Sequence, residues 1–179
     1  MQKSFAEIAI AALLIAGGIS GCDSISIGDI LPPASQEPAP APVSKSSNAY
    51  SALEQSAHEQ VNQYRASLNL PPLKLDPRIS EVAREHSKAM ASDRATFSHD
   101  GFEQRANTVN KAIVYRSFAE NLAFNQGYKD PVRQAVQGWI KSPGHRQNME
   151  GKFDMTGIGV AKNAEGEYYF TQLFVRRLW

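Results

Sequence analysis

The chain has very little cysteine: Cys22 is the single one among its 179 residues. No disulfide can therefore form within one molecule, which excludes the disulfide-stapled scaffolds of small secreted domains. Strong charge of one sign is also absent, because the formal net charge at pH 7 is +1 and both signs are dispersed along the chain. This balance gives no support for nucleic-acid binding. The composition, with 42% hydrophobic and 21% charged residues, is that of an ordinary globular protein.

The chain also lacks the long apolar run of a transmembrane helix. Its N-terminal apolar stretch, residues 8–19, is about a dozen residues long, whereas a bilayer-spanning helix needs about 20. A short apolar stretch that follows a basic residue is typical of a signal peptide. The stretch ends in Ile19-Ser20-Gly21-Cys22, which resembles the bacterial lipobox, whose cysteine is acylated and becomes the first mature residue. We predict a lipoprotein signal peptide over residues 1–21 and lipidation of Cys22 by palmitate or a similar acyl chain; a plain secretory signal is the alternative.

Residues 22–48 are predicted to be a tether. Ser, Pro, Ala and Gln dominate this segment, and its prolines favour extended polyproline II backbone, which buries no core. Several acyl chains on one cysteine anchor a protein stably, whereas a single chain binds reversibly. We therefore expect a partner membrane in the bacterial cell envelope, with the folded domain on its periplasmic or cell-surface side. The choice between inner and outer membrane stays open.

Residues 49–179 show the periodic patterns of a folded domain. Aspartate before proline, at Asp76-Pro77 and Asp130-Pro131, predicts two helix starts, because aspartate caps a helix whose first residue is proline. The predicted elements are helices over residues 50–68, 77–93, 102–109 and 131–141 and a hairpin of strands over 157–161 and 168–175. His86 and Trp139 lie on apolar helix stripes and are expected in the core. The pattern indicates an α+β fold, with helices that cover a small antiparallel sheet.

Three motifs carry side chains that suit a functional site: Phe97-Ser98-His99, Ala119-Glu120-Asn121-Leu122 and Ser142-Pro143-Gly144-His145-Arg146. Two imidazoles and one carboxylate are a sufficient ligand set for zinc or another divalent cation, with a fourth position open, and they also suit general acid–base chemistry. Only the tertiary fold can bring residues so far apart in sequence together. The alternative interpretation makes His99 and His145 ordinary loop residues and Glu120 a helix cap.

These motifs resemble the CAP superfamily of cysteine-rich secretory proteins, antigen five and plant pathogenesis-related proteins, specifically its bacterial, SCP-like branch. The resemblance covers roughly residues 50–176. The further motifs that carry it are Asn62-x-x-Arg65, Trp139, Gly157-Ile158-Gly159-Val160 and Tyr169-x-Thr171-Gln172-x-Phe174. The resemblance implies an α-β-α sandwich over residues 49–179, with the candidate residues in an open cleft.

One departure from the family pattern concerns the residues of this cleft. Eukaryotic members are known for a tetrad of two histidines and two glutamates, but the second glutamate and second histidine are replaced here by Ser142 and Tyr169. His99 and Glu120 thus match the tetrad directly, and His145 is taken as a substitute of the bacterial branch. The disulfides of eukaryotic members are absent as well.

Two functional classes follow for the domain. The first is a binding module whose cleft takes a divalent metal together with a lipid, glycan or peptide, since family members have been linked to sterol and lipid binding. The second is a hydrolase of envelope peptides, esters or peptidoglycan, in which His99, Glu120 and His145 hold a metal that activates water, or a histidine activates Ser98 or Ser142. We expect binding, because the sequence has neither a nucleophile elbow nor a His-Glu-x-x-His helix. The ligand, the metal and the oligomeric state stay open.

Overall fold

The computed structural model describes residues 45–178; the predicted signal peptide, Cys22 and most of the predicted tether lie outside the described residues. The helices are α1 (Lys45–Ser67), α2 (Pro77–Ala91), α3 (Phe102–Ala112), α4 (Pro131–Lys141) and α5 (Pro143–Glu150). The strands are β1 (Lys74–Leu75), β2 (Tyr115–Gln126), β3 (Met155–Lys162) and β4 (Glu167–Arg177). Across this described range, no helix combines the length and the apolar character that a membrane span requires.

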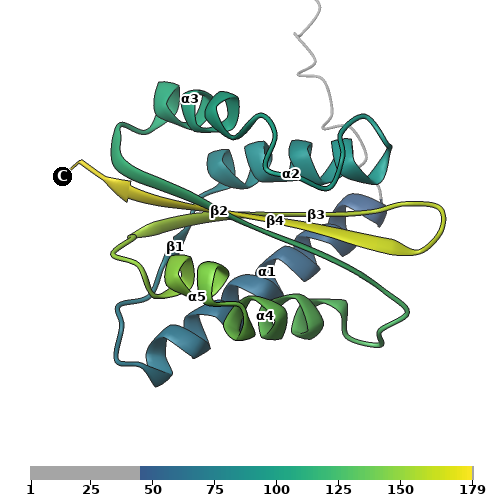
Figure 1. The fold of residues 1–179 in the computed structure, drawn as a ribbon, viewed down its shortest axis with the longest axis horizontal. Coiled ribbons are helices and arrows are strands. Elements are labelled where there is room, and N and C mark those ends of the chain that lie inside the picture. The colour runs from purple at the N-terminus through teal and green to yellow at the C-terminus, as the bar shows by residue number, and fades with distance from the viewer. Residues whose placement is uncertain (1–44, 179) are drawn as a thin grey trace, which may run out of the picture. The chain divides into compact units, whose positions relative to one another are not determined.

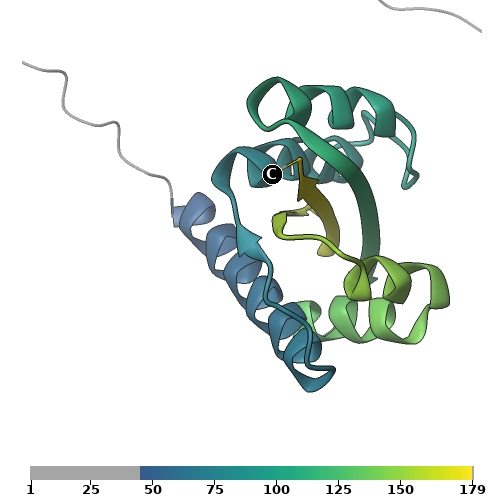
Figure 2. The same cartoon turned by 90° about the vertical axis from the view of Figure 1, so that its left-hand side faces the viewer.

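The strands form one sheet in the order β1-β3-β4-β2, so β2 is an edge strand. Helices α2 and α3 cover one face of this sheet, and α1, α4 and α5 cover the other (Figures 1 and 2). The predicted α+β class and the α-β-α sandwich are therefore confirmed. The sheet is mixed rather than purely antiparallel, because β1 pairs with β3 in parallel while β3–β4 and β2–β4 are antiparallel. A strand of two residues is too short to leave an alternating pattern in the sequence.

The two predicted Asp-Pro helix starts are present. The Asp76 carboxylate accepts hydrogen bonds from the backbone N–H groups of Arg78 and Ile79 at the start of α2, and Asp130 accepts one from Arg133 at the start of α4. Helix α1 begins at Lys45, inside the segment assigned to the tether. Residues 45–49 are mostly polar, so apolar periodicity indicates a helix only from Tyr50 onward.

Strand β2 and helix α5 correct the interpretation of two motifs. Glu120 lies within the 12-residue strand β2, which pairs with β4, and it is not a helix cap. His145 lies in the first turn of α5, an 8-residue helix that begins at Pro143, and not in a loop. Ser142 both ends α4 and precedes α5, because a proline that stops one helix is also favoured as the first residue of the next.

Hydrophobic clusters fill the spaces on either side of the sheet. The cluster beneath α1 and α4 includes Trp139, which is 1% exposed, as predicted. On the other face, α2 packs directly on the backbone of β3. A Cβ atom on Gly159 would lie 2.1 Å from the backbone nitrogen of Arg84, so a side chain at this position is excluded. This close contact fixes α2 and the loop that follows it over the sheet.

Candidate functional site

The candidate site is built on the edge strand β2, where neighbouring side chains point to opposite faces of the sheet. Glu120 points toward the α2–α3 layer and accepts hydrogen bonds from Arg105 of α3. Asn121 points toward the other layer, and its Nδ2 donates to the backbone carbonyl of His145 in α5 at 3.0 Å. The strand therefore connects the two helical layers at this edge.

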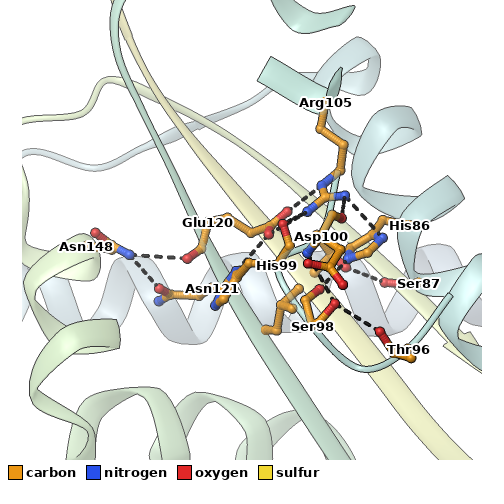
Figure 3. A network of polar contacts seen from close by, with 12 residues as sticks. His86, Ser87, Thr96, Ser98, His99, Asp100, Arg105, Glu120, Asn121 and Asn148 are labelled. Carbon is orange, nitrogen blue, oxygen red and sulfur yellow. Dashed lines mark hydrogen bonds and ion pairs between the residues drawn. The ribbon is translucent and has the colours of Figure 1, made fainter. Parts of the chain in front are cut away.

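Glu120 is the centre of a buried polar network (Figure 3). Its carboxylate accepts two hydrogen bonds from Arg105, Nε to Oε2 at 2.6 Å and Nη2 to Oε1 at 2.7 Å. The third partner is Nδ1 of His99, which lies 2.8 Å from Oε1. The Glu120 side chain is 1% exposed. A bidentate pair of this kind is among the stronger ionic contacts in proteins, because geometry and charge act together.

The loop that carries His99 is held in place by the same arginine. Nη1 of Arg105 donates to the carbonyl of Asp100 at 2.8 Å, and Nη2 donates to the carbonyl of His99 at 3.3 Å. The His99 side chain is 55% exposed although its Nδ1 contacts a buried carboxylate. Since Nδ1 is engaged, Nε2 is the ring nitrogen left for a ligand.

His86 closes the network from α2. Its Nε2 lies 3.1 Å from the carbonyl of Ser98, and its Nδ1 lies 3.3 Å from Nη1 of Arg105. Burial, followed by the neighbouring Arg105 charge, lowers the pKa of His86 and keeps the ring neutral at pH 7. Nδ1 is then the acceptor and Nε2 the donor. His86 is thus the hydrogen-bonded core histidine that its apolar helix stripe predicts, and it also borders a cavity of about 440 Å³ between α2 and α3.

His145 is half-buried in the opposite layer. Burial lowers its pKa, and the charge of His99 lowers it further. Asn148 of α5 donates from Nδ2 to the Glu120 carbonyl at 3.2 Å and to Oδ1 of Asn121 at 2.9 Å. These amide contacts fix α5, and with it the position of His145, against β2.

The predicted three-ligand metal site does not fit this arrangement. Throughout residues 45–178, no group of three or more His, Cys, Asp and Glu side chains is placed to hold a metal ion. Both oxygens of Glu120 are already paired, and the guanidinium of Arg105 repels a second cation. Glu120 and the helix that carries His145 also lie on opposite faces of the sheet. The structure does bring His99 and Glu120 together, through a direct hydrogen bond.

The serine-dependent hydrolase interpretation lacks a nucleophile in contact with His99. Within the described part of the chain, the His99 ring hydrogen-bonds to no hydroxyl or thiol group. Oγ of Ser98 lies 3.1 Å from Oγ1 of Thr96 and accepts from the backbone N–H of Asp100 at 3.2 Å. A histidine oriented by a carboxylate supplies two of the three members of a catalytic triad. The third member, a hydroxyl group in contact with the histidine, is not in place.

An aromatic cluster that includes Phe97, two residues before His99, was not identified from the sequence. The ring centroids of Phe97 and Phe124 are 6.1 Å apart, and those of Phe124 and Tyr169 are 5.2 Å apart. Phe97 is 51% exposed and Phe124 is 45% exposed, while Tyr169 is buried. Phe124 lies four residues after Glu120 on the same face of β2, so recognising this segment as a strand would have revealed the cluster. We call Phe97, His99, Phe124 and Tyr169 together the aromatic–histidine face.

Arg105 is the other functional residue that sequence analysis missed. It lies in α3, outside the three motifs, and only the tertiary structure places its guanidinium against Glu120, His86 and the His99 loop. No local pattern distinguishes it from an arginine on a solvated helix face, which is the commoner case.

Comparison with known proteins gives consistent matches. The model of the cysteine-rich secretory protein family matches residues 58–174. The chain is 31% identical over 134 residues to the uncharacterized protein YkwD of Bacillus subtilis. The aligned region covers 72% of this chain and 49% of that protein. It is similar to an extracellular protein of Bacillus anthracis that contains an SCP domain, with a TM-score of 0.62, 28% identity and coverage of 76% of this chain and 45% of that one.

A second solved structure shares the fold at lower identity. An outer surface protein of Borrelia burgdorferi has a TM-score of 0.60 and 22% identity, over 70% of this chain and 93% of that one. The chain thus spans about half the length of the two Bacillus relatives and nearly all of the shorter Borrelia protein.

Proposed function

The chain belongs to the cysteine-rich secretory protein (CAP) family, and from this premise we propose that it is a membrane-anchored, extracytoplasmic binding module. The description of the Bacillus anthracis relative as extracellular and of the Borrelia burgdorferi protein as an outer surface protein supports this location. The lipobox at Cys22 supports the anchor. In this proposal the ligand binds at the aromatic–histidine face.

The observation that carries the proposal is a fixed, exposed imidazole on the loop that also carries the exposed ring of Phe97. His99 is oriented by a carboxylate that is 1% exposed, so little conformational freedom is lost when a ligand binds its Nε2. Phe97 and Phe124 expose about half of their surface at the same face, and contiguous apolar surface of this kind marks interaction sites.

A glycan fits this combination best among the ligands considered. A pyranose ring presents an apolar C–H face, which packs on the electron-rich face of an aromatic ring. Its hydroxyl groups can hydrogen-bond with an imidazole nitrogen. A lipid chain on so open a face would leave much of its surface in water, so it gains less from burial. We therefore propose a sugar of the cell envelope as the ligand class.

Loss of an aromatic ring or of the imidazole should weaken glycan binding. We expect Phe97→Ala and His99→Ala each to raise the Kd for soluble peptidoglycan oligosaccharides about tenfold, which corresponds to about 1.4 kcal/mol. Isothermal titration calorimetry on the purified chain measures this. Leu68→Ala, which removes an exposed apolar side chain at the end of α1, is the matched control and should bind normally. Equal affinity in all four proteins would contradict the assignment of the face.

The same variants separate the other functional classes. Turnover of a peptide, ester or peptidoglycan panel that disappears in His99→Ala would instead indicate the hydrolase. Stoichiometric binding of Zn²⁺ alone that disappears in both His99→Ala and His145→Ala would indicate a metal centre that forms by rearrangement of the site. Zinc or another divalent cation as a cofactor thus stays a prediction, with an experiment that decides it.

The membrane anchor is tested independently of the ligand. Cys22→Ala should prevent acylation and the signal-peptide processing that depends on it, because the thiol is the group that is acylated. Wild-type protein should fractionate with membranes and incorporate labelled palmitate, and the variant should not incorporate the label. A wild-type protein that is recovered in the soluble fraction without label would show that the signal is a plain secretory one.

A further inference from the structure

A second pocket lies away from the aromatic–histidine face and shares none of its residues. It is formed by the end of α1, the turn between α5 and β3 and the last residues of β4, and its volume is about 420 Å³. Five basic side chains contribute to its walls, from Arg65, Arg116, Lys152, Arg176 and Arg177. The acidic residues of the same walls are Glu150 and Asp154.

Arg65 is a buried cation without a carboxylate partner in the described chain. It is 1% exposed. Its guanidinium donates to the carbonyl oxygens of Pro71 at 2.9 Å, Met149 at 2.6 Å and Gly151 at 3.1 Å, and its Nη2 makes no hydrogen bond within residues 45–178. Burial lowers the pKa of Arg65, which reflects the cost of keeping this charge away from water. A nearby anion would offset that cost.

The other basic side chains leave the pocket positive. Arg176 and Lys152 form no ion pair within the structurally described residues, and Arg116 donates to the backbone carbonyls of Arg177 and Leu178 rather than to a carboxylate. Positive side chains that converge in a cleft concentrate the electrostatic potential there.

The two acidic residues of the pocket are already engaged. Asp154 accepts from Nε of Arg177 at 2.5 Å and from the backbone N–H of Arg177 at 2.9 Å. Glu150 accepts from the hydroxyl of Tyr64 at 2.6 Å and lies 3.9 Å from Arg146. The pocket therefore has an excess of positive charge that its own carboxylates do not neutralise.

We propose that this pocket binds the phosphate group of a ligand. Guanidinium groups match phosphate oxygens in geometry and charge, and Arg65, Arg116 and Arg176 place three of them around one space. The volume of about 420 Å³ is in the range of small-molecule sites and leaves room for a polar body beyond the phosphate. The phosphate belongs either to the headgroup of an anionic lipid in the membrane or to a soluble phosphate ester, which present the same chemistry.

Inorganic phosphate is the probe for this site. The full chain in detergent micelles should show saturable binding by calorimetry, and Arg176→Gln and Lys152→Gln should each raise the Kd about tenfold. Arg133→Gln is the control, because Arg133 is an exposed arginine of α4 that forms no ion pair in residues 45–178. It should bind phosphate normally, as should Phe97→Ala, whose change lies in the aromatic–histidine face. The proposal is overturned if inorganic phosphate shows no saturable binding. It is also overturned if Arg176→Gln and Arg133→Gln lose the same amount of affinity for phosphate.

Vesicles distinguish the two sources of the phosphate. The full chain is inserted into vesicles of phosphatidylcholine, with and without phosphatidylglycerol, and titrated with inorganic phosphate. If a lipid headgroup occupies the pocket, phosphatidylglycerol competes and the apparent Kd for phosphate rises. An unchanged Kd assigns the site to soluble phosphate esters. Arg176→Gln should be insensitive to phosphatidylglycerol, which separates competition in the pocket from general repulsion by the anionic surface.

Discussion

Replacing Glu120 by glutamine should lower the free energy of unfolding by about 3–5 kcal/mol. The substitution keeps the size of the side chain but removes the negative charge that faces Arg105, whose side chain is 10% exposed. The guanidinium then stays buried without a counter-charge, and the amide group directs N–H donors toward donors of Arg105 or His99. Urea denaturation followed by circular dichroism measures the effect. A loss of this size is a large fraction of the stability of a typical domain.

A surface ion pair provides the control for Glu120→Gln. Glu81 pairs with Arg84, but its side chain is 57% exposed, so Glu81→Gln should cost less than about 1 kcal/mol. The double variant Glu120→Leu with Arg105→Met removes both charges and should recover much of the stability, because apolar residues of similar volume often replace a buried pair at little cost. A cost below about 1 kcal/mol for Glu120→Gln would mean that water reaches the pair and that His99 is not rigidly held.

Trp139→Ala should also cost about 3–5 kcal/mol. The indole is 1% exposed and packs in the cluster beneath α1 and α4. Its Nε1 donates to the carbonyl of Leu122 at 2.8 Å, so truncation leaves a cavity and also a buried strand carbonyl without its partner. Because this bond joins α4 to the edge strand β2, the loss should be seen both in global denaturation and in faster amide exchange along β2.

Two substitutions separate the packing of Trp139 from its hydrogen bond. Trp139→Phe keeps most of the ring volume and removes the donor, so it should cost clearly less than Trp139→Ala. Gln137→Ala, on the exposed side of the same helix, should change the free energy of unfolding by no more than about 0.5 kcal/mol. A cost for Trp139→Ala below about 1 kcal/mol in denaturant titration would show that α4 is not packed as described.

Local signals in the sequence determined most of the helices and the C-terminal hairpin. Asp76 and Asp130 cap helices whose first residues are prolines, and this interaction involves neighbouring residues alone. The hairpin of β3 and β4 is likewise a local unit, with alternating apolar residues on either side of a turn. The motifs around these elements were specific enough to identify the family, because their order and spacing reflect the whole domain.

The strand β2 could not be found in the same way, because its stability comes from pairing with β4, which follows it by about 40 residues. Its sequence places Glu120, Asn121 and Asn125 among buried positions, where polar residues hide the usual alternation of a strand. These residues are buried because Arg105, α5 and α4 supply hydrogen-bond partners. Only the folded structure shows those partners.

The sequence therefore identified His99 and Glu120 as site residues, whereas the tertiary structure added Arg105 and decided which contacts these residues make. His99 and Glu120 were identified as neighbours from their motifs, and they are in contact. Whether His145 joins them depends on how α5 packs against β2, which no local pattern specifies. The pleat of the edge strand directs Glu120 to Arg105 and turns Asn121 to α5, and this alternation makes Glu120 the partner of a guanidinium.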